Sequence, residues 1–192
     1  VSRGDAALDD LDLNPILVQA ERKMEAGSPR DRDREAVPDT LDALMVRDAD
    51  TALQFGSKMQ LSYNVENTQR AIGTRLSSHI VRKFGMTGLR ENHISVRLRG
   101  TAGQSLGAFA TQGLRLEVIG DANDYVGKGL SGGTIIVRPS AAAAFVAHEN
   151  TIIGNTVLYG ATSGKLFAAG QTGERLCVRN SGATAVVEGA GT

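Results

Sequence analysis

The amino-acid sequence predicts a mainly β fold, a parallel β-helix of about five coils with about 20 residues per coil, over residues 94–192. The first observation behind this prediction is a constant interval, since every twentieth position carries a matching residue type. One column is small or turn-compatible and one is wholly aliphatic: Gly100, Gly120, Ser140, Gly160 and Asn180, and Leu106, Val126, Val146, Leu166 and Val186. Each repeat of such an array buries its apolar side only against its neighbours. We therefore expect the aliphatic column to form one continuous buried stack.

Alternation within each repeat is the second observation. Even positions such as Val96 and Leu98 are mostly aliphatic, whereas odd neighbours such as Arg97 and Glu117 are mainly polar or charged. The two further columns, each with one polar member, are Val96, Leu116, Ile136, Thr156 and Leu176, and Leu98, Val118, Arg138, Leu158 and Val178. A period of two is typical of a strand with one face inward. Three short strands per coil fit the repeat length. Antiparallel hairpins fit less well, because their equivalent residues would not stack at a constant interval.

The placement of glycine is the third observation. The chain has 23 glycines, concentrated in its second half, which fits many tight turns. Gly113, Gly133 and Gly173 also recur in multiples of 20, while Gly154 is one step out of phase. We expect these residues to form coil corners, where glycine tolerates positive φ at little cost. A one-residue bulge near residues 139–141 would explain the step at Gly154.

Two segments precede the array. Residues 1–38 are predicted to form an N-terminal arm or linker, with a short helix over residues 15–24. Residues 39–93 are predicted to begin with a short helix over residues 48–56, followed by a half-buried strand over residues 58–63.

An amphipathic helix is predicted to complete the second segment. Its apolar stripe is formed by four residues spaced by four, Ile72, Leu76, Ile80 and Phe84. Asn64 or Asn67 would cap its start and Gly85 would end it. Because a solenoid needs its open end covered, we expect this helix to cap the first coil. Its charged residues are expected to form a solvated face rather than an anion site: Arg70, Arg75, Arg82 and Lys83.

Composition narrows the class of protein. The 21 basic and 21 acidic residues give a formal net charge of zero, so nothing indicates a nucleic-acid or anionic-membrane partner. Cys177 is the only cysteine, which excludes a disulfide, a Cys-rich zinc site and an iron–sulfur cluster within this chain. No apolar run approaches the roughly 20 residues that cross a bilayer, and the first residues lack a secretion signal. We expect a cytoplasmic protein, and a piece of a longer chain because the sequence lacks an initial Met.

Two glycine-rich motifs suggest nucleotide binding at first sight. Residues 127–132 match G-x-G-x-x-G, but a dinucleotide site needs a helix after the motif, and the following residues 134–138 are predicted to be a strand. Residues 160–166 are similar to a phosphate-binding loop, but only three residues separate the glycines and Leu166 replaces the magnesium-binding hydroxyl. Both motifs are therefore interpreted as repeat corners.

The remaining acidic residues, histidines and cysteine do not form a recognisable metal-binding or catalytic motif. Residues 121–124 (DAND) have the wrong spacing for a calcium loop, and we expect Asx turns that cap Gly120 instead. The three histidines are scattered, and Cys177, between inward-facing neighbours, is expected to point outward or toward a partner. We assign no catalytic, cofactor-binding or metal-binding residue in this chain.

Five strings of the sequence are distinctive: residues 73–77 (GTRLS), 103–109 (GQSLGAF), 120–133 (GDANDYVGKGLSGG), 153–164 (IGNTVLYGATSG) and 179–183 (RNSGA). Together they resemble the C-terminal GXGXG domain of the glutamate synthase large (alpha) subunit. The resemblance runs from about Val37 to the end of the chain. It implies a right-handed β-helix.

The resemblance also implies a function for the parent enzyme, which makes glutamate from glutamine and 2-oxoglutarate. An amidotransferase domain would release ammonia, and a barrel domain with FMN and an iron–sulfur cluster would reduce the iminoglutarate. These domains of the same chain are the implied partners, together with a small NADPH/FAD or ferredoxin electron donor. The fragment would then be a non-catalytic scaffold that itself holds no cofactor, while its parent is an enzyme. Two alternatives remain, a β-helix scaffold subunit similar to that of formylmethanofuran dehydrogenase and a free-standing β-helix enzyme acting on carbohydrate.

Overall fold

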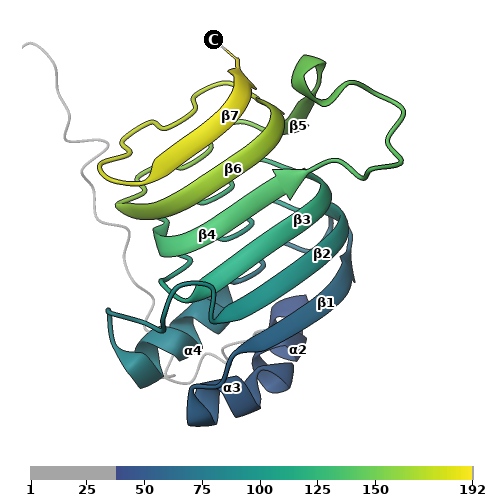
Figure 1. Cartoon of the computed structure of the whole chain (residues 1–192). Helices are drawn as coiled ribbons and strands as arrows, with labels where there is room; N and C mark the ends of the chain where they lie inside the picture. Colours follow the sequence, from purple (N-terminus) through teal and green to yellow (C-terminus); the bar gives the residue numbers. More distant parts are fainter. Residues whose placement is uncertain (1–37, 192) are drawn as a thin grey trace, which may run out of the picture. The chain divides into compact units, whose positions relative to one another are not determined.

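The computed structural model describes residues 38–191 (Figure 1). The arm predicted over residues 1–38, including its helix, lies outside the described residues except for Pro38. Within the described part, no helix is long and apolar enough to cross a membrane.

The described chain is mainly β, as predicted, and its strands form one parallel sheet. The elements are α2 (Leu41–Asp48), α3 (Asp50–Phe55), β1 (Met59–Val65), α4 (Thr74–Phe84), β2 (Ile94–Ala102), β3 (Leu114–Ala122), β4 (Ser131–Arg138), the 3₁₀ helix η1 (Ala147–Glu149), β5 (Thr151–Ile153), β6 (Ser163–Thr172) and β7 (Thr184–Ala190). The long strands follow the order β1-β2-β3-β4-β6-β7, and short β5 pairs with β3 and β6 (Figure 1). The predicted strand at residues 58–63 and the short helix near residues 48–56 are therefore present.

Among the strand pairs of residues 38–191, the register keeps the predicted interval of 20 residues at every paired position only between β2 and β3. Leu114 of β3 pairs with Ile94 of β2, as the repeat predicts, but Leu116 pairs with Ile135 of β4, one position before the predicted Ile136. Between β4 and β6, residues 139–150 leave the sheet in a long excursion that includes η1, so that Ile135 pairs with Leu166 (Figure 1). The predicted one-residue bulge at residues 139–141 is thus wrong, because a whole segment and not a single residue is inserted there.

These shifts overturn the predicted aliphatic stack. Leu106, Val126 and Leu166 are fully buried, but Val146 lies on the excursion with 49% exposure, and Val186 is 54% exposed. The one-residue shift at β4 has a similar effect on its columns. It turns Ile135 and Val137 inward and leaves Ile136 and Arg138 on the outer face. A slip of one residue exchanges the two faces of a strand, because side chains alternate with a period of two.

The segments that connect consecutive strands form a second wall opposite the strands, which we call the turn wall. It consists of residues 103–110, 123–130, 154–161 and 173–180. Each segment has three residues with left-handed φ, spaced by two: Ser105, Gly107 and Phe109, Tyr125, Gly127 and Gly129, Thr156, Leu158 and Gly160, and Arg175, Cys177 and Arg179. The prediction of three strands per coil is wrong here, because these described segments are consecutive turns rather than strands.

Hydrogen bonds between consecutive segments hold the turn wall together. The central left-handed residue donates its N–H to the preceding segment, as Gly127 does to Leu106 O and Leu158 does to Val126 O, both at 2.8 Å. The outer left-handed residues donate to the following segment, as Tyr125 does to Asn155 O at 2.9 Å. Backbone groups in the interior are therefore satisfied between repeats, as they would be in a sheet.

The helices lie at the end of the sheet formed by β1 and β2 (Figure 1). Leu76 and Ile80 of α4 are fully buried and belong to the same hydrophobic cluster as Leu116 of β3. Gly85 ends α4 with a φ of 72°, as predicted, but the predicted cap residue Asn64 lies inside β1.

The start of α4 is capped from another helix. The buried carboxylate of Asp42, on α2, accepts hydrogen bonds from the backbone N–H groups of Gly73 (3.1 Å) and Arg75 (2.6 Å). Burial raises the pKa of Asp42 above its usual value, although the backbone donors at Arg75, Gly73 and Leu76 act in the opposite direction. A carboxylate at a helix N-terminus satisfies N–H groups that have no partner within the helix.

Candidate functional site on the outer face of the sheet

The outer face of the sheet carries a compact group of charges around Glu117. The strand register places Arg97 of β2 and Ile136 of β4 beside this residue, and places Arg138 beside Ile119, two residues further along β3. Arg115 precedes Glu117 by two residues on the same strand and therefore shares its face. We call Arg97, Arg115, Arg138 and Glu117 the arginine cluster.

Glu117 is the centre of the arginine cluster. Arg138 donates a hydrogen bond from Nε to Oε1 at 3.0 Å, and a terminal nitrogen of the same guanidinium lies 3.0 Å from this oxygen. A guanidinium nitrogen of Arg97 and one of Arg115 each lie 3.6 Å from Oε2. Partial burial alone would raise the pKa of Glu117, but the hydrogen bond and charge of Arg138, followed by the charges of Arg97 and Arg115, outweigh it and lower this pKa.

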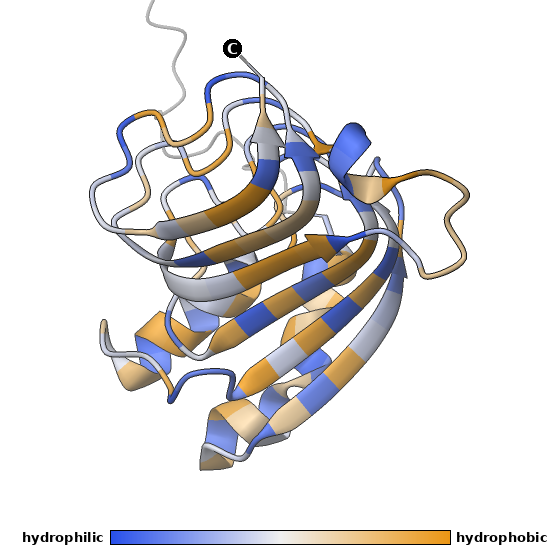
Figure 2. Ribbon diagram, turned by 45° about the horizontal axis from the view of Figure 1, so that its top comes forward, coloured by the Kyte–Doolittle hydropathy of each residue, from blue (hydrophilic) through white to orange (hydrophobic). Residues whose placement is uncertain are grey.

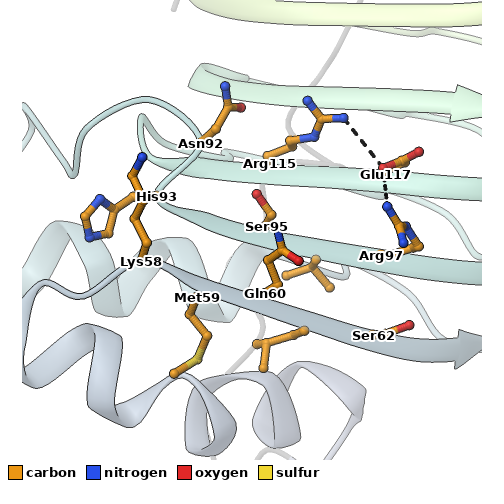
Figure 3. A pocket seen from close by; sticks show the side chains of 12 residues that line it. Lys58, Met59, Gln60, Ser62, Asn92, His93, Ser95, Arg97, Arg115 and Glu117 are labelled. Atoms are coloured by element: carbon orange, nitrogen blue, oxygen red, sulfur yellow. Dashed lines mark ion pairs between the residues drawn. The ribbon is translucent and has the colours of Figure 1, made fainter.

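An open hollow of about 780 Å³ lies beside the cluster, over β1, β2 and β3 (Figure 3). Its lining includes Lys58, Ser95 and His93, together with Arg97 and Arg115. His93 is held by the backbone, since its Nε2 contacts the carbonyl oxygen of Gly56. No hydrogen bond joins Ser95 to His93 or Lys58 among the described residues, so the hollow contains no paired nucleophile and base. The arrangement can attract an anionic group, because three guanidinium groups surround one carboxylate.

The first glycine motif, residues 127–132, is a corner of the turn wall. Its amides are occupied: Gly127 and Gly129 donate to Leu106 O and Tyr159 O, at 2.8 Å each, and Ser131 donates to Ala110 O at 2.9 Å. The dinucleotide-binding form of this motif presents free N–H groups at a helix N-terminus, and here strand β4 follows the motif instead.

The second glycine motif, residues 160–166, has the same structural role. Gly160 donates to Val178 O at 3.0 Å, while Thr162 and Ser163 both donate to Leu130 O. Strand β6 begins at Ser163, so this motif also lacks the helix of a phosphate-binding loop.

The acidic string at residues 121–124 connects consecutive turn-wall segments. Asp124 Oδ1 accepts the N–H of Asn155 at 2.8 Å, and Asn155 Oδ1 accepts the N–H of Glu174 at 2.8 Å. The predicted Asx turn at Gly120 is therefore wrong for Asp124, whose side chain bonds to the next segment rather than to its own turn.

The remaining candidate groups do not come together. His79 lies on α4, His93 just before β2 and His148 on η1, and the described part of the chain contains no group of three or more His, Cys, Asp and Glu side chains that could hold a metal. Cys177 is half-buried and packs against the core rather than facing outward as predicted. The prediction missed the arginine cluster because the regular interval places Arg138 in an inward column. The polar odd positions Arg97, Arg115 and Glu117 were its only signal.

A parallel sheet backed by a wall of left-handed, glycine-rich turns defines a class of repeat protein. In this class, backbone hydrogen bonds join each repeat to its neighbours. The chain belongs to the GXGXG motif family, whose family model matches residues 42–192. The resemblance to the glutamate synthase large subunit noted in the sequence is confirmed by its relatives.

Three relatives illustrate the match. The chain is 67% identical to the glutamate synthase [NADPH] large chain of Azospirillum brasilense, over 100% of this chain and 13% of the relative. It is 43% identical to the glutamate synthase [NADH] of Saccharomyces cerevisiae over 93% of this chain and 8% of the relative. It is 48% identical to the ferredoxin-dependent glutamate synthase 2 of Synechocystis over 78% of this chain and 10% of the relative. The chain thus spans about a tenth of the length of these relatives.

Proposed function

We propose that this chain is a non-catalytic structural domain of a glutamate synthase large subunit, folded as a right-handed parallel β-helix. Each coil would consist of one long strand and one segment of the turn wall. The observation that supports this most strongly is that backbone N–H groups of the two glycine motifs donate hydrogen bonds to neighbouring repeats rather than pointing freely toward a ligand.

As a scaffold, the domain would hold the amidotransferase and FMN-binding domains of the same chain in the relative position that ammonia transfer requires. The small share of the relatives that this chain spans, 8–13%, supports a role within a much larger polypeptide. The parent reaction would convert glutamine and 2-oxoglutarate to two glutamate. We place it in the cytoplasm as part of the same proposal.

The cofactors of the parent would lie outside these residues. An iron–sulfur cluster needs several thiolate ligands, and this sequence contains one cysteine, Cys177. The glycine motifs do not fit the phosphate of FMN either, because their N–H groups are already paired. The names of the relatives mention NADPH, NADH and ferredoxin, so the electron donor varies among similar enzymes, and we assign none.

Two other functions remain as alternatives. A scaffold subunit of a complex similar to formylmethanofuran dehydrogenase would use the same fold, but the relatives above favour glutamate synthase. A free-standing carbohydrate enzyme would need a groove of paired carboxylates and aromatic residues. Among the described residues, Glu117 is the only carboxylate lining the hollow, and this carboxylate is neutralised by arginines.

Three substitutions in the full-length large chain test this proposal. Cys177→Ala and Lys128→Ala should leave kcat within about twofold, since a scaffold residue touches no reacting atom, whereas loss of a general acid or base costs about 10²–10⁴-fold. Val126→Asp should lower the yield of folded enzyme or, where enzyme remains folded, the glutamate formed per glutamine hydrolysed. A loss of kcat greater than about a hundredfold in Cys177→Ala or Lys128→Ala, with unchanged thermal unfolding, would contradict the scaffold role.

A further inference from the structure

The outer face of the sheet has two chemically different halves. In β2 and β3 inward aliphatic residues alternate with outward residues that are mostly polar or charged, with Ile119 as the apolar exception, so the outer face is mainly polar. In β4, β6 and β7 the central residues are apolar on both faces: residues 135–137 (IIV), 166–169 (LFAA) and 185–187 (AVV). Figure 2 shows this contrast as alternating colours on β2 and β3 and longer hydrophobic stretches on β4, β6 and β7.

The outward residues of the second half form one continuous row. The register pairs Ile136 with Phe167 and Phe167 with Val186, so these side chains lie side by side across three strands. We call them the apolar stripe. Phe167 is 38% exposed and Val186 54% exposed, and Ile136 is partly exposed.

Strands with apolar runs on both faces are typical of sheets that are covered on both sides. The inner faces of β4 and β6 are already buried in the hydrophobic cluster, which contains Ile135, Val137 and Leu166. Among residues 38–191 nothing covers the stripe on the outer side, since both Phe167 and Val186 remain exposed. A stripe of this kind, next to polar residues, marks a protein–protein contact.

Charge identifies the chemistry of the partner. The apolar stripe continues directly into the arginine cluster, because Ile136 pairs with Glu117 in the register. Three guanidinium groups against one carboxylate leave a surplus of two positive charges at this end. Each guanidinium has five N–H donors, and the side chains of Arg97 and Arg138 are 52% and 41% exposed, so donors remain free to reach a partner. Beside Phe167 on β6, Lys165 is already paired with Glu91 at 2.6 Å.

We propose that the apolar stripe and the arginine cluster together form the docking surface for another segment of the parent chain, one with apolar residues next to carboxylates. This inference rests on the proposed function, since it names the face through which the scaffold acts. The parent chain is the chosen occupant because most of the relatives' length lies outside these residues. A second copy of this chain fits less well, because it brings a second positive surplus rather than the complementary charge.

Hydroxyl-radical footprinting tests the docking surface directly, with the modification of Phe167 measured by mass spectrometry in the 192-residue chain and in the full-length large chain. Phe167 modification should fall severalfold in the full-length chain, because docking would bury a side chain that is 38% exposed here. The 192-residue chain should be monomeric in sedimentation.

Three variants of the full-length chain sharpen the test, and two of them form a matched pair. Val186→Asp, in the apolar stripe, should restore Phe167 modification by weakening the contact. Val178→Asp, which changes a 39% exposed valine on the turn wall, should leave Phe167 protected. Arg138→Glu should act like Val186→Asp, because it reverses the charge that meets the acidic partner.

Two results would overturn the inference. Equal modification of Phe167 in both chains would show that this face is free, and the scaffold function would stand, docked through another face. A dimeric 192-residue chain in which Phe167 is already protected would assign the stripe to a second copy. Failure of the proposed function is detected separately, by loss of kcat in the Cys177 and Lys128 variants.

Discussion

The two walls of each repeat are stabilised differently, the strand wall by the burial of side chains and the turn wall by hydrogen bonds to neighbouring repeats. In the strand wall, β2 and β3 follow residue preference: aliphatic residues point inward, and most outward residues are polar or charged. The turn wall works against preference, since eight of its twelve left-handed positions are not glycine. A non-glycine residue in this region costs about 1–2 kcal/mol. The bonds to neighbouring repeats offset that cost, so the turn wall depends on stacking more than the strand wall does.

The largest effect is expected from a charge placed inside the turn wall. Val126→Asp should lower the free energy of unfolding by about 3–6 kcal/mol, because it buries an unpaired carboxyl group. Chemical denaturation followed by circular dichroism measures the loss. The same substitution at exposed Val186, a member of the same sequence column, should cost less than about 0.5 kcal/mol. Equal losses at the two sites would contradict the register described above.

Replacing glycine by alanine should destabilise the strand wall more than the turn wall, which is the reverse of the effect of a buried charge. Gly120 lies in the strand wall with φ 148°, and a Cβ there would overlap the carbonyl oxygen of Gly100. Gly120→Ala should therefore cost about 2–4 kcal/mol in thermal or chemical unfolding. Gly160 lies in the turn wall with φ 63° and open space around its Cα, so Gly160→Ala should cost only about 1 kcal/mol of backbone strain. A larger loss at Gly160 than at Gly120 would reverse the account.

Where both walls meet the helices, Asp42→Ala should cost about 2 kcal/mol, because the N–H groups of Gly73 and Arg75 lose their acceptor. The raised pKa of Asp42 means that the folded state binds its proton more tightly than the unfolded state does. Its titration therefore adds stability as pH falls from the folded pKa toward 3.8. The difference between wild type and the variant should widen over that range in denaturant titrations, and a narrowing would be inconsistent with a raised pKa.

Glu117→Gln should show the opposite pH dependence on the strand wall. Because the pKa of Glu117 is lowered by its arginines, its charge stabilises the fold above about pH 4.5, and this contribution is lost as pH falls through the folded pKa. The variant should lose up to about 1 kcal/mol at neutral pH, less at high salt, since the arginines are partly exposed. Denaturation at pH 7 and pH 3 measures it, and a cost that is greater at pH 3 would refute the cluster.

The smallest effect is expected when a residue is replaced by glycine, and the resulting change in stability should have opposite signs in the two walls. Arg179→Gly, at an exposed left-handed position with φ 57°, should be neutral or raise stability by up to about 1 kcal/mol, because strain is relieved. Ser62→Gly on β1 should lower stability by about 0.5–1 kcal/mol, as glycine does within strands. Calorimetric midpoints under the same buffer distinguish these outcomes, and a loss at Arg179 similar to that at Ser62 would mean that the turn wall is not strained.

The sequence predicted the strand wall well and the turn wall poorly, for a physical reason. The alternation around Val96 and Leu98 reports burial directly, so β2, β3 and the register between them followed from it. Leu158 or Cys177 in a left-handed conformation leaves no such signal, because the conformation is imposed by bonds to neighbouring segments. The excursion at residues 139–150 was hidden because the glycine spacing continued nearly in phase across it, although the pairing of β4 with β6 skips the whole segment.

The arginine cluster could not be predicted from the sequence, for a related reason. Arg138 belongs to the arginine cluster only because β4 slips by one residue against β3, and no local feature of the sequence marks that slip. The cap of α4 by Asp42, which is far from Gly73 in the sequence, likewise depends on the packing of two helices and not on the residues next to the helix start.

Amide hydrogen exchange with and without FMN tests the central claim, that the glycine-rich segments are structural bonds and not ligand loops. The N–H groups of Gly127, Leu158 and Gly160 should exchange as slowly as those of β2 and β3 without flavin, and their rates should not change when it is added. Fast exchange that slows at these three amides on addition of FMN would contradict the account, because it would show that the turn wall forms around a cofactor.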